Sequence, residues 1–466
     1  MATTPLLRRV DLAAGQALTE SALARSGGID ADIVAAAAAI VAEVRTGGDA
    51  ALAAYTARFD GVTVPSEALR VTNAEIEVAF TLVDDELIQA LELAAERIER
   101  FHERQLTQSW FTPEPDGVIL GQKVTPIGRV GIYVPGGRAQ YPSSVLMNAI
   151  PAVVAGVREI AMVAPPQADG TIAPMTLVAA AIAGVDEIYK VGGAQAVAAL
   201  AYGTDTIARV DKIVGPGNAY VAAAKKLVMG DVGIDMIAGP SEVCVLADDT
   251  AIPAFIAIDL MAQAEHDPRA AVYLVTDDPS LPALVESALE LLLADSPRAD
   301  ITRPALEHNS VAVVCENFAD AIAAVNAIAP EHLEVQVDDP FEVLGDIDNA
   351  GAIFLGTWSS EAIGDYIAGP NHVLPTGGTA RFSSPLSVDD FTKKSSVISY
   401  SFDALERDAD AVVAIADREG LWAHARSVDM RLGAAYLAAE EAEEEGAEGA
   451  DPAALTGRAD TMGEGE

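Results

Sequence analysis

Cysteine is scarce in this sequence of 466 residues, which contains only two. Cys244 in "SEVCVLAD" and Cys315 in "SVAVVCENF" lie in short apolar runs that are typical of buried strands. Two such residues form neither a disulfide framework nor a metal cluster. A reactive thiol is the less common alternative to an inert, buried one, so we expect both thiols to be structural.

Long apolar runs are also missing. No stretch of about 18 residues lacks a charge or a proline, so a membrane-spanning helix is not supported. The first residues, "MATTPLLRRVDLAAG", lack the basic cluster, long apolar core and small-residue cleavage site of a signal peptide. We therefore expect a cytoplasmic protein.

Basic residues are few: 29 Lys and Arg face 70 Asp and Glu, giving a net charge of −41. This charge makes nucleic acid and anionic membranes unlikely partners. Ten of the acidic residues lie between Glu440 and Glu466, so most of the excess belongs to the body of the chain. A globally acidic surface favours a halophilic protein that works in concentrated salt, where screening is strong. An acidic protein of ordinary salt preference is the alternative.

The length and the alternation of patterns predict several α/β lobes. Helical spacing runs through residues 31–61, with a Gly-Gly interruption, and again through 74–106. From Gly128 onward, apolar strand-like runs alternate with glycine turns and helices, which predicts right-handed crossovers and parallel sheets. We expect two Rossmann-like lobes and small helical terminal segments, with these boundaries: an N-terminal arm 1–28, a first lobe 29–135 and 243–380, a second lobe 136–242, a C-terminal segment 381–436, and a disordered acidic tail 437–466.

Glycine turns at the starts of helices can cradle phosphates, because free backbone amides and the helix dipole favour anions there. The turn "GPGNAY", Gly215 to Tyr220, comes near a dinucleotide-binding fingerprint but lacks its third glycine. Many α/β proteins carry such turns for packing alone. Three of them in one lobe nevertheless favour a nucleotide pocket.

Histidine is scarce as well, with six residues. His266 follows Gln263 by three positions at the end of an apolar helical run, so the two side chains share a helical face, as metal ligands do. His332 follows Glu331 in "IAPEHLEV", where a carboxylate beside an imidazole suits acid–base chemistry, with a capping pair as the alternative. For the others we expect an exposed helical residue (His102), a surface loop residue (His308), and either a site-lining or a structural residue (His372).

No two histidines have the spacing of a zinc finger or of HExxH, so a metal site must be assembled from distant segments. Gln263, His266, Asp365 and His424 together supply oxygen and imidazole donors without thiolate. Such a set suits a borderline divalent ion such as zinc, with open positions for substrate.

Seven stretches carry a close resemblance to the histidinol dehydrogenases, the enzymes of the last two oxidations in histidine biosynthesis. These stretches are "GIYVPGGRAQYPSSVLMNAIPA", "VGGAQAVAALAYGT", "DKIVGPGNAYVAAAK", "AGPSEVCVLAD", "DLMAQAEHDP", "IAPEHLEV" and "GDYIAGPNHVLPTGGTARFSSPLSVDDF". The resemblance covers nearly everything from residue 30 to 436. It implies a fold similar to that of aldehyde dehydrogenases, although no cysteine here lies in a loop comparable to that of their nucleophile.

The resemblance also implies a role for each matching position. Zinc ligands fall on Gln263, His266, Asp365 and His424, the last from the partner subunit of a homodimer, with one zinc per subunit. The catalytic pair falls on Glu331 and His332. Substrate contacts fall on Ser241, Gln263, His266, His332, Asp365, Glu419 and His424, and NAD contacts on Tyr133, Gln195 and Asn218.

The implied activity is the four-electron oxidation of L-histidinol to L-histidine through L-histidinal, with NAD as the oxidant. Two rival functions remain. A metal-dependent hydrolase or aldolase could use the same ligands without the glycine-turn lobe, and a non-catalytic nucleotide-binding protein could keep the glycine turns without any turnover.

Overall fold

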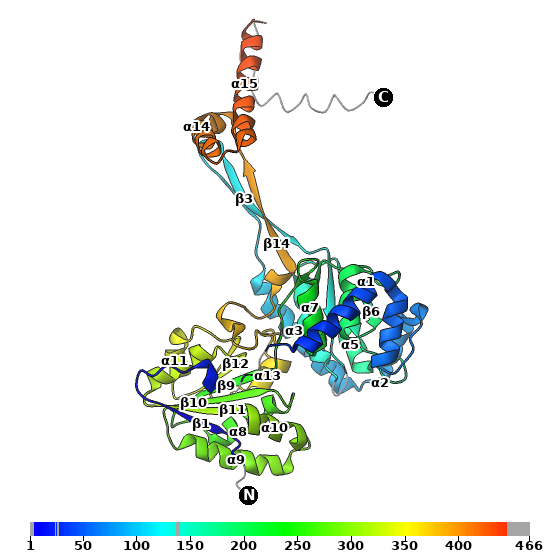
Figure 1. Cartoon of the computed structure of the whole chain (residues 1–466), viewed down its shortest axis with the longest axis vertical. Coiled ribbons are helices and arrows are strands. Elements are labelled where there is room, and N and C mark those ends of the chain that lie inside the picture. Colours follow the sequence, from blue (N-terminus) through cyan, green and yellow to red (C-terminus); the bar gives the residue numbers. More distant parts are fainter. Residues whose placement is uncertain (1–3, 24, 26–27, 137–139, 445–466) are drawn as a thin grey trace. The chain divides into compact units, whose positions relative to one another are not determined.

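The computed structural model describes residues 4–23, 25, 28–136 and 140–444 (Figure 1). They divide into two compact units, the first drawn from residues 1–106 and 126–392 and the second from 107–125 and 393–466. Strands and helices alternate through the first unit and build two sheets whose neighbouring strands all run parallel. The predicted α/β class with two parallel-sheet lobes is therefore confirmed.

A five-stranded sheet with the order β6-β5-β4-β7-β8 forms the core of one lobe. Its strands are β4 (Arg129–Tyr133), β5 (Glu159–Ala164), β6 (Glu187–Lys190), β7 (Lys212–Val214) and β8 (Gly233–Ile234). Helices α2 (Asn73–Leu82), α3 (Asp85–His102), α4 (Pro142–Val154) and α5 (Pro174–Ile182) cover one face. The other face is covered by α1 (Ala31–Phe59), α6 (Gly193–Tyr202) and α7 (Ala219–Val228). Burial on both faces explains why these strands are continuous apolar runs.

Helices α1, α2 and α3 pack on this five-stranded lobe, whereas the expected boundaries grouped residues 29–135 with residues 243–380. The buried side chains of α1, such as Val44 and Leu52, share a core with those of α6 and α7. An amphipathic pattern shows which face of a helix is apolar but not which sheet that face covers. The helical break expected at the Gly-Gly pair is present, because Gly48 adopts φ 53° and ψ −137° inside α1.

A six-stranded sheet with the order β1-β11-β10-β9-β12-β13 forms the core of the other lobe (Figure 1). Its strands are β1 (Arg8–Leu12), β9 (Glu242–Ala247), β10 (Ala271–Thr276), β11 (Ser310–Cys315), β12 (His332–Gln336) and β13 (Ala352–Leu355). Helices α8 (Pro253–Ala264), α9 (Leu281–Asp295) and α10 (Ala299–Asn309) pack on one face and α11 (Phe318–Ile328) on the other. The short helices α12 (Pro340–Val343) and α13 (Glu361–Tyr366) follow β12 and β13. The expected N-terminal arm thus contributes a strand, β1, to this sheet.

Both cysteines lie in this sheet. Cys244 in β9 and Cys315 in β11 are buried, unpaired thiols, as predicted. Burial raises the pKa of each thiol, to about 11 for Cys315. Neither residue is therefore poised as a thiolate nucleophile.

The second unit contains a three-stranded sheet with the order β14-β3-β2, built from β2 (Trp110–Pro113), β3 (Ile119–Pro126) and β14 (Thr392–Ser399). Two helices follow, α14 (Phe402–Arg418) and α15 (Trp422–Glu444). Helix α15 continues past Tyr436 into the range expected to be disordered, because its Ala, Leu and Glu residues are strong helix formers. The remainder of the expected tail, 445–466, lies outside the described residues. None of the described helices combines the length with the apolar composition that crossing a membrane requires.

Candidate functional site

A cavity of about 830 Å³ in the first unit gathers most of the predicted site residues. Its walls come from both lobes: the turn after β7, the segment before β9, the end of α8, the start of β12, and α13 with the loop that follows it. The predicted residues that line it are Asn218, Ser241, Gln263, His266, Glu331, His332 and Asp365. Segments far apart in the sequence therefore meet at one place, as the assembly of a metal site from distant segments requires.

The end of α8 presents the first two predicted donors. The helix ends at Ala264, and the His266 amide donates to the carbonyl of Gln263 at 3.2 Å, so His266 lies in the turn just beyond the helix. Gln263 is fully buried, and neither its Oε1 nor its Nε2 has a hydrogen-bond partner. A buried amide without partners is costly, because both polar atoms have lost water. This cost is relieved where the amide oxygen binds a ligand.

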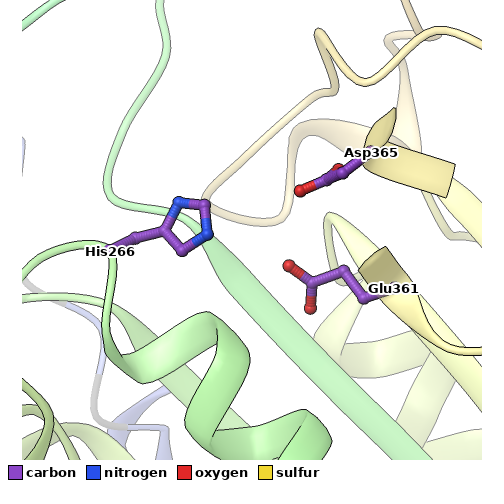
Figure 2. Close-up of side chains that lie close together, drawn as sticks. All are labelled: His266, Glu361 and Asp365. Atoms are coloured by element: carbon purple, nitrogen blue, oxygen red, sulfur yellow. The ribbon is translucent and has the colours of Figure 1, made fainter. Parts of the chain in front are cut away.

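Helix α13 presents Asp365 and a further carboxylate, Glu361, that the sequence reasoning missed. Figure 2 shows His266, Glu361 and Asp365 directed toward a common point, and one donor atom from each lies within 4.8 Å of the other two. Glu361 is 2% exposed, and its Oε2 has no partner. Glu361 precedes Asp365 by four positions, and that helical spacing was the signal that could have revealed it.

The charges around this point are strongly coupled. Burial opposes ionisation of Asp365, but His332 and the nearby His372 and His266 outweigh it and lower the pKa of Asp365. Burial raises the pKa of Glu361 to about 7, against the opposing effect of His332. Desolvation lowers the pKa of His266. Asp365 is thus held as a carboxylate and His266 as a neutral imidazole, the forms that bind a cation.

The pair Glu331 and His332 enters the cavity from the start of β12. The chain reaches it through Ala329, whose φ of 49° is left-handed. The backbone amide of Glu242 donates to Glu331 Oε2 at 2.8 Å, and His332 Nδ1 donates to the carbonyl of the same residue at 3.2 Å. Both side chains are thereby fixed against the first residue of β9. Glu331 thus accepts from a backbone amide, as the capping alternative expects, and the acid–base role of the pair stays a prediction.

The surroundings shift the pKa values of this pair. Burial raises the pKa of Glu331 to about 8. For His332, burial favours the neutral form, but the carboxylates of Glu361, Glu331 and Asp365 outweigh it and raise its pKa to about 10. His332 Nε2 lies 3.7 Å from Asp365 Oδ1. Because Nδ1 donates to a carbonyl, Nε2 is the nitrogen that is directed at His266, Glu361 and Asp365.

The glycine turn after β7 forms the wall of the cavity on the side of the five-stranded lobe. Asn218 caps α7, and its Oδ1 accepts from the amides of Tyr220 at 3.0 Å and Val221 at 3.2 Å. Gly215 has φ +111°, and a Cβ there would lie 2.2 Å from the carbonyl oxygen of Tyr133. Only glycine therefore fits at this position.

The other two predicted NAD contacts are buried. Tyr133 ends β4, is 3% exposed, and its hydroxyl accepts from the Gly193 amide at 3.0 Å. Gln195 in α6 is 1% exposed, and its Oε1 has no partner. The two residues lie around one glycine turn, at Gly192-Gly193, that the sequence singled out.

The remaining histidines differ from one another. His102, expected to be exposed, is fully buried: its Nδ1 donates to the Ile98 carbonyl at 2.8 Å, because the last turn of α3 packs into the core. His308 is exposed as expected, but it lies at the end of α10 rather than in a loop. His372 lines the cavity, and its Nδ1 donates to the Asp365 carbonyl at 2.9 Å. It is therefore both a site-lining residue and a structural one.

Two predicted site residues belong to the second unit. Glu419 directly follows α14 and His424 lies in the first turn of α15, both exposed. The described part of the cavity is built without them.

Comparison with known proteins gives a consistent result. The family model for histidinol dehydrogenase matches residues 23–432. The chain belongs to the histidinol dehydrogenase family. The histidinol dehydrogenase of Geobacter sulfurreducens is 58% identical over 84% of this chain and 92% of its own, and that of Bacillus subtilis 55% identical over 84% and 91%. A crystal structure of histidinol dehydrogenase from Elizabethkingia anophelis has a TM-score of 0.87 at 37% identity, covering 93% of this chain and 99% of that one.

Proposed function

We propose that the protein oxidises L-histidinol to L-histidine through L-histidinal, with NAD⁺ as the oxidant in both steps and one zinc ion per subunit. The observation that carries this proposal is the convergence of His266, Asp365 and the pair Glu331–His332 on one cavity, in a member of this family. The cavity is also lined by the glycine turn Gly215–Asn218 at the start of α7, a position that suits the phosphates of a dinucleotide.

The donor set fits a divalent cation. Gln263 has two buried atoms without partners, and His266 and Asp365 have pKa values that favour their metal-binding forms. Gln263, His266 and Asp365 would hold the ion together with His424 of the partner subunit. Bound there, zinc would orient the substrate nitrogens and offset the carboxylate charges that keep His332 protonated.

The catalytic pair performs the proton transfers. His332 accepts the proton of the substrate hydroxyl in the first oxidation. Glu331 then accepts a proton from water as the water adds to the aldehyde, and the proton held by His332 passes to the aldehyde oxygen. His332, neutral again, deprotonates the resulting hydrate in the second oxidation. NAD⁺, when bound, accepts the hydride that leaves the substrate carbon in each oxidation. The bonds from Glu242 to both side chains keep their orientation fixed between the two steps.

The remaining roles follow the family resemblance. We propose that Tyr133, Gln195 and Asn218 contact NAD on the five-stranded lobe, and that Ser241 and Glu419 contact the substrate. The C-terminal segment 381–436 would complete the site of the partner in a homodimer, and the enzyme would work in the cytoplasm.

One assay tests the activity against its rivals. The purified protein is incubated with L-histidinol and NAD⁺, with zinc or with a chelator, and absorbance of NADH is followed. We expect two NADH for each L-histidinol consumed, and loss of turnover after chelation that zinc restores. A hydrolase or aldolase would give no NADH, and a nucleotide-binding protein would consume no histidinol. Full activity of metal-free protein would refute the zinc role.

A further inference from the structure

We infer that Glu334 is a positioning residue that ties together the three elements carrying the metal donors and the catalytic histidine. The inference rests on the proposed metal centre and extends it to a side chain that does not line the cavity. Glu334 lies in β12, two residues after His332, and is 1% exposed.

The strand places three polar residues in a row. Side chains alternate between the faces of a strand, so His332, Glu334 and Gln336 share one face. The residues between them, Leu333 and Val335, belong to the apolar core on the opposite face. Glu334 and Gln336 are therefore buried polar groups directly behind the catalytic histidine, and their hydrogen bonds decide what they do.

One carboxylate oxygen of Glu334 holds α13. Glu334 Oε1 accepts from the backbone amide of Glu361 at 2.9 Å, at the first residue of that helix. An acceptor is needed there because the first amides of a helix have no partner within the helix. Helix α13 has only six residues and a single buried one, Glu361 itself. So short a helix depends on outside contacts for its position, and with it the position of Asp365.

The other oxygen connects to α8. Gln336 Nε2 donates to Glu334 Oε2 at 2.8 Å and to Asp259 Oδ2 at 3.2 Å. Asp259 lies one turn before Gln263 on α8, on the same helical face. A continuous chain of hydrogen bonds thus runs from the helix of Gln263, through the strand of His332, to the helix of Asp365.

Glu334 thus affects the reaction by fixing the positions of the metal donors, and it does not contact the substrate. Partners that orient metal ligands typically contribute 10- to 100-fold to metal affinity. Loss of Glu334 frees the N-terminus of α13 and the link to α8 together, so the donors lose their fixed separation. Replacement by Gln keeps an acceptor for the Glu361 amide.

The test measures zinc affinity of the full-length protein by competition with a chromogenic chelator. Glu334→Ala is expected to weaken zinc binding about 10- to 100-fold. Glu334→Gln is expected to keep most of the affinity. The Co²⁺-substituted protein supplies a second readout, because its visible absorption bands report ligand geometry and should change in Glu334→Ala. Glu187→Gln is the matched control: Glu187 pairs with Arg129 on the five-stranded sheet, away from the donors.

The results distinguish failure of the positioning role of Glu334 from failure of the proposed metal centre. Wild-type zinc affinity and an unchanged Co²⁺ spectrum in Glu334→Ala would overturn the inference while leaving the metal centre intact. Failure of the wild type itself to bind zinc would refute the proposed metal centre instead. Should Glu334→Ala not fold, Gln336→Leu releases only the link to α8. Weaker zinc binding in that variant supports the inference, and unchanged binding overturns it.

Discussion

Replacing Lys225 by methionine tests the ion pair that supports the glycine turn of the cavity. Lys225 Nζ contacts Asp235 and donates to the Gly215 carbonyl at 2.9 Å, while Asp235 Oδ2 accepts from the Gly215 amide at 2.8 Å. The side chains of the pair are 3% and 1% exposed. Methionine fills the space of the lysine stem but leaves a buried carboxylate without its counter-charge. Breaking a buried pair in this way costs about 3–5 kcal/mol of unfolding free energy.

Two further variants isolate the cause of the loss. Lys226→Met changes the next residue, which is exposed, and is expected to stay within about 0.5 kcal/mol of the wild type. Lys225→Met combined with Asp235→Leu removes both charges and is expected to recover part of the loss.

Urea unfolding followed by circular dichroism gives the stabilities, and isothermal titration gives NAD⁺ affinity. Because both polar groups of Gly215 are held by the pair, Lys225→Met should also weaken NAD⁺ binding. Equal stability of Lys225→Met and Lys226→Met would refute the reasoning.

Four other predictions concern the site, the assembly and the charge. His332→Asn is expected to slow both oxidations by about 10²- to 10⁴-fold, and Glu331→Gln mainly the oxidation of added L-histidinal; wild-type rates in stopped-flow NADH traces would remove the pair from the mechanism. Mixing inactive His424→Asn and Gln263→Ala proteins should restore part of the activity, because hybrid dimers regain one intact site; no recovery contradicts subunit sharing. Burial raises the pKa of Asp60 from 3.8 to about 6, so its carboxylate form destabilises the fold as pH rises through that window. Asp60→Asn should therefore raise the free energy of unfolding at pH 8 and not at pH 4, by about 1 kcal/mol or less since Asp60 is partly exposed. Melting temperatures of the variant and the wild type at both pH values give this comparison. Finally, stability and turnover should increase from dilute buffer to molar KCl, and equal values would contradict the halophilic interpretation.

The sequence predicts the fold class well because each parallel strand is buried on both faces. Runs such as the one around Cys244 can be recognised as strands without knowledge of their neighbours. The break of α1 at Gly48 is also predictable, because glycine tolerates the required backbone angles. The lobe on which α1 packs is not predictable, since an apolar helical face packs equally well on either sheet.

The site is predictable in its residues but not in its electrostatics. The resemblance identifies His332, but its raised pKa arises from Glu331 beside it and from Glu361 and Asp365, which α13 brings to it. Glu361 escapes notice because two acids four positions apart in a short helix are also typical of an exposed helical face. Its burial follows only from the contact of α13 with α8 and from the bond between its amide and Glu334 of β12.

The pairing of β1 with β11 bears on how the chain acquires its structure. Arg8 to Leu12 align in parallel with Val311 to Cys315, so the first strand finds its neighbour only after some three hundred intervening residues have left the ribosome. The strands β4 to β8 come from one continuous stretch of the sequence, so their sheet can form earlier during synthesis. The six-stranded sheet cannot be completed until its last strands have been synthesised, and neither can the cavity between the lobes. The nascent protein thus completes its catalytic pocket only when the later strands are in place, after the sheet that carries the glycine turn can already have formed.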